Sequence, residues 1–115
     1  MSTPEVAAGQ LKCVRVLSVI LADGTLTLPT AWTIHTFPGY EPPLTPQLEG
    51  FVHLYPTPAY ADLHALLQAY ADRFGAKVEE ELHGGKDRVA LHVTVKWQGV
   101  ELHVWGPALP EGGAA

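Results

Sequence analysis

The strongest constraint on the fold is the alternation of apolar and polar residues in the last third of the chain. Residues 88–97 read RVALHVTVKW and residues 100–105 read VELHVW, with Gln98-Gly99 between them. An alternation of period two is typical of half-buried strands, and a two-residue turn ending in glycine favours a tight hairpin. With residues 77–83 and the turn that follows them, these segments predict a C-terminal three-stranded meander.

The Gln98-Gly99 turn also predicts how the last two strands pair. It places Trp97 opposite Val100, and the pairs that follow on this face are apolar too. The other face is polar and aromatic, with the pairs Lys96 and Glu101, Thr94 and His103, and His92 and Trp105. A sheet of this kind needs another element to cover its apolar face.

A helix suited to that role is predicted over residues 58–74. Its apolar residues recur at intervals of 3, 4, 3 and 4, and Gly75 follows as a stop signal. The fold class is therefore predicted to be α+β, a mainly antiparallel sheet with one main amphipathic helix packed on one face. The stripe consists of Tyr60, Leu63, Leu67, Tyr70 and Phe74.

The N-terminal part of the chain allows two interpretations. Residues 1–10 are expected to form a loose arm, and the β-branched residues 11–22 are expected to form a strand. Asp23-Gly24 would then turn the chain into a second strand over residues 25–28. An amphipathic helix from Pro4 to Leu21 remains open as an alternative, because Ala7, Leu11, Val14, Leu17 and Leu21 also fall at helical spacing.

Two further strands are predicted, over residues 31–37 and 51–55, on either side of a proline-rich segment. That segment, residues 38–46, has four prolines in nine residues, which favours an extended excursion.

The length of 115 residues suits one domain. The expected organisation is a single α+β domain over residues 11–106 and a C-terminal tail over residues 107–115.

Composition excludes several functional classes. The formal net charge is −5, which argues against direct binding to nucleic acid or to anionic membranes. The single cysteine, Cys13, excludes an internal disulfide and fits a reducing cytoplasm. No apolar run approaches the roughly 20 residues needed to cross a bilayer. Abundant Ala, Gly and Pro and the absence of Asn indicate a GC-rich coding sequence, of a bacterium, phage or mobile element.

Possible metal ligands gather on the polar face of the predicted meander. Glu79 is expected beside His92, with His103 diagonal to His92, and diagonal neighbours on a sheet lie roughly 7–8 Å apart. Two histidines and one carboxylate can bind zinc or iron. A solvated face with His92 stacked on Trp105 explains the same residues without a metal.

The sequence contains no nucleophile or phosphate-loop motif, so catalytic residues and cofactors are not predicted. The leading hypothesis is a small non-enzymatic protein-binding or assembly module, acting as a homodimer or within a complex. The alternatives are a metal- or ligand-binding enzyme using Glu79, His92 and His103, and an acidic inhibitor of a nucleic-acid-binding protein. The expected contact residues are exposed aromatic residues and the proline-rich segment: Phe37, Tyr40, Pro42, Pro43, Leu44 and Trp105.

Overall fold

A computed structural model describes residues 3–27, 29, 31–40, 44–82 and 87–111. The described chain forms two helices and a five-stranded sheet, so the α+β class is confirmed. The elements are α1 (Thr3–Ala22), β1 (Ala31–His35), β2 (Gln47–Phe51), α2 (Tyr60–Phe74), β3 (Glu79–Leu82), β4 (Val89–Trp97) and β5 (Val100–Ala108).

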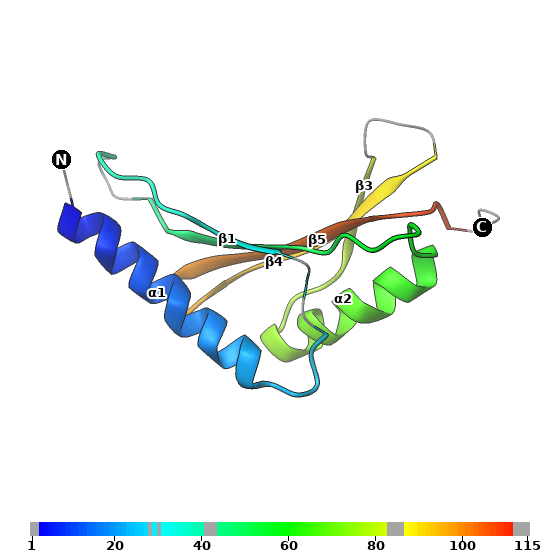
Figure 1. Cartoon of the computed structure of the whole chain (residues 1–115), viewed down its shortest axis with the longest axis horizontal. Coiled ribbons are helices and arrows are strands. Elements are labelled where there is room, and N and C mark those ends of the chain that lie inside the picture. The colour runs from blue at the N-terminus through cyan, green and yellow to red at the C-terminus, as the bar shows by residue number, and fades with distance from the viewer. Residues whose placement is uncertain (1–2, 28, 30, 41–43, 83–86, 112–115) are drawn as a thin grey trace.

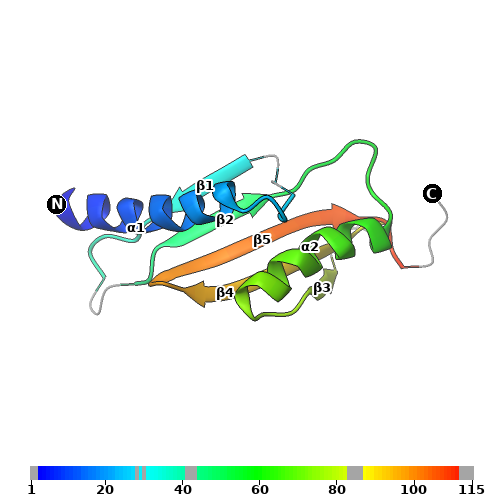
Figure 2. The ribbon, with the colours of Figure 1, turned by 90° about the horizontal axis from the view of Figure 1, so that it is seen from below.

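The sheet has the strand order β1-β2-β5-β4-β3. Neighbouring strands are antiparallel except β2 and β5, which run parallel. Figure 1 shows both helices on the same side of the sheet, and Figure 2 shows α1 over the β1–β2 half and α2 over the β4–β5 half. The fold is a two-layer sandwich in which both described helices lie on one face of the sheet, and no helix of the described residues lies on the other.

The predicted meander and its register are confirmed. Trp97 pairs with Val100 across the turn, and His92 pairs with Trp105 further along. Gln98 and Gly99 have φ angles of 50° and 78°, as a type I′ turn requires at both central positions. The predicted C-terminal tail begins too early, because β5 continues to Ala108 and pairs with the start of β4.

The helix predicted over residues 58–74 is confirmed as α2, but it begins two residues later. It spans Tyr60–Phe74 rather than residues 58–74, since the extended residue Ala59 precedes its first turn. Gly75 ends it with a φ of 72°, a left-handed conformation in which glycine has no side chain to clash. The predicted stripe faces the sheet, with Leu63, Leu67 and Tyr70 fully buried.

The predicted N-terminal arm and hairpin are wrong. Residues 3–22 form one helix, α1, because Cys13, Val16 and Ile20 recur at helical spacing and pack into the core. Burial of this stripe outweighs the modest strand preference of its β-branched residues. Asp23-Gly24 is not a type I′ turn, since neither residue has a positive φ.

Asp23 instead fixes the end of α1 against α2. Its carboxylate accepts hydrogen bonds from the backbone N–H and the hydroxyl of Thr25, over 2.9 and 2.6 Å. It also pairs with Arg73 at the end of α2, with 3.2 Å between Arg73 Nε and Asp23 Oδ2. Asp23 therefore joins the ends of the two helices and takes no part in a hairpin turn.

The two strands around the proline-rich segment also differ from the prediction. The first, β1, ends at His35, two residues early, and the strand predicted over residues 51–55 is wrong. The strand is β2, residues 47–51, because its register with β5 places Leu48 in the core. Gly50 faces the same side, and the Trp32 ring occupies the space where a side chain would lie.

Candidate functional site on the open sheet face

The candidate site is the side of the sheet without a helix, which we call the open face (Figure 1). Cross-strand pairing arranges its residues in rows. The rows are His35, Gln47, Glu101 and Lys96; Thr33, Glu49, His103 and Thr94; and Ala31, Phe51, Trp105, His92 and Glu79. This arrangement confirms the predicted location of His92, His103 and Trp105 on one polar and aromatic surface.

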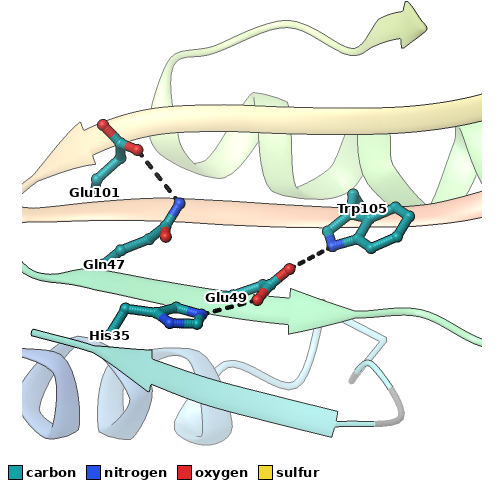
Figure 3. Close-up of polar contacts among 5 residues, drawn as sticks. All are labelled: His35, Gln47, Glu49, Glu101 and Trp105. Atoms are coloured by element: carbon teal, nitrogen blue, oxygen red, sulfur yellow. Dashed lines mark hydrogen bonds and ion pairs between the residues drawn. The ribbon is translucent and has the colours of Figure 1, made fainter. Parts of the chain in front are cut away.

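Glu49 lies at the centre of this surface and joins residues of three strands. Its Oε1 lies 2.9 Å from His35 Nε2 on β1, and its Oε2 accepts a hydrogen bond of 2.7 Å from Trp105 Nε1 on β5 (Figure 3). Nearby, Gln47 Nε2 donates to Glu101 Oε1 over 3.4 Å. The Glu49 contacts orient the Trp105 indole from the neighbouring parallel strand.

The same contacts determine the charge of the site. Hydrogen bonds from His35 and then from Trp105 lower the pKa of Glu49, so this carboxyl is ionised at neutral pH. Burial, followed by the nearby His92, lowers the pKa of His103, which favours a neutral imidazole. Glu49 therefore acts as a hydrogen-bond acceptor rather than as a proton donor.

Five rings form a continuous row across the open face, which we call the aromatic cluster. Phe51 lies between His53 and Trp105, with ring centroids 5.6 and 4.7 Å apart respectively. His103 stacks near Trp105 at 6.4 Å and meets His92 edge to face at 5.7 Å. Partly exposed aromatic rings of this kind are typical of protein contact surfaces.

The predicted metal ligands are brought near one another, although in the described part of the chain they are not grouped as a metal site requires. Glu79 pairs with His92 as expected, and the rings of His92 and His103 are in contact. Within residues 3–27, 29, 31–40, 44–82 and 87–111, no three His, Cys, Asp or Glu side chains are grouped so that they could hold a metal ion. Nδ1 of His92 is buried without a hydrogen-bond partner in this described part of the chain.

The other predicted contact residues lie at the connection from β1 to β2. Tyr40 and Leu44 are about half exposed, at 55% and 47%. Phe37 is half-buried and lines a groove between this connection and the first half of α1. Pro42 and Pro43 lie outside the described residues. At the start of the segment predicted to be extended, residues 38–46, Pro38 and Gly39 form a turn, with a φ of 86° at Gly39.

Sequence reasoning missed the residues that organise the open face. Glu49, Phe51 and His35 come from β1 and β2, whose bounds or pairing were not predicted. The signal for Glu49 was the short alternation of Gln47, Leu48 and Glu49, which Gly50 interrupts. Only the parallel pairing of β2 with β5 brings Glu49 beside His103 and Phe51 beside Trp105.

Comparisons with known proteins assign no family to this chain. No protein-family model, no curated protein and no solved structure matches it. Among the residues that the structure describes, no helix is long and apolar enough to cross a membrane.

Proposed function

We propose that this protein is a small non-enzymatic protein-binding module, which associates with copies of itself and holds another protein on its open face. The observation that carries the proposal is the aromatic cluster, a row of partly exposed rings on the sheet face opposite both described helices. Because Glu49 is ionised and bonded to two neighbouring side chains, this surface suits contact better than proton transfer.

The charge of the open face indicates the kind of partner. Its strands carry Glu49, Glu79, Glu81 and Glu101 against Lys96. A partner surface that presents arginine complements this arrangement, since a guanidinium stacks on aromatic rings and pairs with carboxylates. A cytoplasmic accessory protein of a GC-rich bacterium, phage or mobile element fits the lone cysteine and the composition.

Photo-crosslinking in the native cell tests this proposal. Thr33 is exposed on the open face beside Glu49, so replacing Thr33 with p-benzoylphenylalanine places a photoreactive group at the proposed contact. We expect one discrete adduct with a different, basic protein, which Trp105→Ala abolishes and Trp105→Phe weakens less. The same adduct in the Trp105→Ala protein, or no adduct in the parent, would remove the open face as the contact surface.

The predicted acidic inhibitor of a nucleic-acid-binding protein is a second candidate, favoured by the excess of glutamates on the open face. It differs in the identity of the partner and in salt dependence. An inhibitor that occupies a phosphate-binding site should lose affinity steeply as ionic strength rises. The crosslinked protein can therefore be purified and tested for competition with nucleic acid over a range of salt concentrations.

A further inference from the structure

Helix α1 has two apolar faces on opposite sides. Cys13, Val16 and Ile20 are buried against the sheet. On the outer side, Leu11, Val14 and Leu21 remain 49%, 46% and 53% exposed. A helix whose second face is apolar and open to solvent is typical of a helix that packs against another partner.

The outer side has the spacing of a helix-packing seam. With the exposed residues Ala7 and Ser18, it reads Ala7, Leu11, Val14, Ser18 and Leu21, at intervals of 4, 3, 4 and 3. These are heptad a and d spacings, and none of the five positions is charged. The Ser18 hydroxyl donates to the Val14 carbonyl over 2.9 Å, so the seam can be covered without leaving that hydroxyl unpaired. We call these five residues the α1 seam.

The α1 seam has a basic border. Arg15 lies beside it and is exposed, and no ion pair joins Arg15 to the other residues that the structure describes. Helix α1 carries Lys12 and Arg15 against Glu5, whereas the whole chain has a net charge of −5. A surface that covers this seam is expected to be acidic at its border.

The outer side of α2 has the complementary properties. Ala61, Ala65, Gln68 and Asp72 follow one another at intervals of 4, 3 and 4, and the first two are small and exposed. A shallow groove along this side is lined by Tyr60, Ala61, His64, Ala65, Gln68 and Glu111. Asp62 is exposed on the other flank of the Ala61 and Ala65 row, away from the groove.

We propose that a second copy of this chain covers the α1 seam with the outer side of its α2, the two helices running antiparallel. In the register that matches the intervals, Ser18 lies beside Ala61, Val14 beside Ala65 and Leu11 beside Gln68. Val14 and Ser18 then face the small residues Ala65 and Ala61, and Leu11 lies against the longer side chain of Gln68. Arg15 comes within about half a turn of Asp62 of the second copy, so opposite charges meet at the border.

This contact uses the helical layer and leaves the open face available to another protein (Figure 1). It rests on the self-association part of the proposed function and is independent of the aromatic cluster. Because α1 and α2 are different surfaces, each copy offers one of each. The copies then form a closed pair, a ring or an open chain, depending on the rotation between them.

A charge exchange tests the contact. The full chain is studied by sedimentation velocity over a wide concentration range, with far-UV circular dichroism to confirm folding. We expect the parent to associate, and Arg15→Glu and Asp62→Arg each to raise the midpoint concentration of association about tenfold. The double variant should return to within about threefold of the parent, because the ion pair is restored with reversed signs.

Lys77→Glu is the matched control, since it makes the same charge change at an exposed residue outside both helices and should leave association unchanged. Leu11→Glu should abolish association even in the double variant. A parent that stays monomeric overturns the proposal. The proposal is also overturned if Leu11→Glu abolishes association but combining Arg15→Glu with Asp62→Arg does not restore the association that these two variants lose singly. That result indicates that α1 pairs with the α1 of the other copy. None of these results depends on Trp105. The proposal that the open face binds another protein is therefore tested separately from this contact.

Discussion

Trp105 and Glu49 lie on neighbouring parallel strands, and the indole N–H of Trp105 donates to Glu49 Oε2 over 2.7 Å. His35 approaches the other oxygen of the same carboxylate. This one carboxylate therefore links β1, β2 and β5 on the face opposite the two described helices. Hydrogen bonds between its own side chains order the open face, so a partner would bind a surface that is already ordered.

The first prediction concerns Glu49. Replacing it with alanine leaves the Trp105 and His35 nitrogen atoms, both part-buried, without their acceptor. We expect Glu49→Ala to lower the free energy of unfolding by about 1–3 kcal/mol, measured by urea denaturation. Thr33→Ala, at the paired position on β1, serves as control and should cost much less. Equal losses in the two variants would show that the hydrogen bonds of Glu49 contribute little.

The second prediction concerns pH. Burial and the nearby His92 lower the pKa of His103 in the folded protein, although Glu49, Glu101 and Glu81 act in the opposite direction. Between the lowered value and the usual value near 6.5, the unfolded chain binds more protons than the folded chain. The stability that the folded protein has with a neutral His103 is therefore fully present above about pH 6.5. It decreases as the pH falls below this value.

Urea denaturation at several pH values between 7.5 and 5 checks this sign. The wild type should lose stability on acidification over this range, and His103→Asn should lose less, because asparagine does not titrate. The lowered pKa of Glu49 contributes in the same direction, but only where carboxyl groups begin to titrate, nearer pH 4.5. A wild type that gains stability as the pH falls from 7 to 5.5 would contradict the environment described for His103.

The third prediction concerns Gly106, where β5 passes close to the residue after β2. A Cβ atom at Gly106 would clash with the carbonyl oxygen of Val52, which is backbone and has little freedom to move. The N–H of Val52 also donates to the Trp105 carbonyl over 2.8 Å. We expect Gly106→Ala to destabilise the protein by about 2 kcal/mol or more, as overpacking does.

Gly24→Ala is the comparison for this variant, because a Cβ atom there meets nothing within 4 Å. Its melting temperature should stay close to that of the wild type, whereas that of Gly106→Ala should fall by several degrees. If both variants melted at the wild-type temperature, this result would contradict the close approach of β5 to Val52.

The parts of the fold that were predictable are those in which short-range signals agree. In the C-terminal meander, residue alternation, the Gln98-Gly99 turn and apolar cross-strand pairs all indicate one register, and the structure has it. The helix that ends at Gly75 was also predictable, because its apolar stripe and its glycine stop indicate the same element. The location of His92, His103 and Trp105 on one face followed directly from this register.

The N-terminal half was not predictable in the same way, since its signals conflict. The β-branched residues of α1 favour a strand, whereas Cys13, Val16 and Ile20 fit a helix, and packing against the sheet decides between them. Glu49 was missed for a different reason. Its role depends on the parallel pairing of β2 with β5, which joins segments 54 residues apart in the chain and leaves no short-range signal.

Native mass spectrometry of the untagged full chain shows whether the protein works by contact with other proteins, including copies of itself. We expect a mass of two or more chains with no added metal or small molecule. A monomer at every concentration, and above all a monomer that carries a bound ion or small ligand, would contradict it.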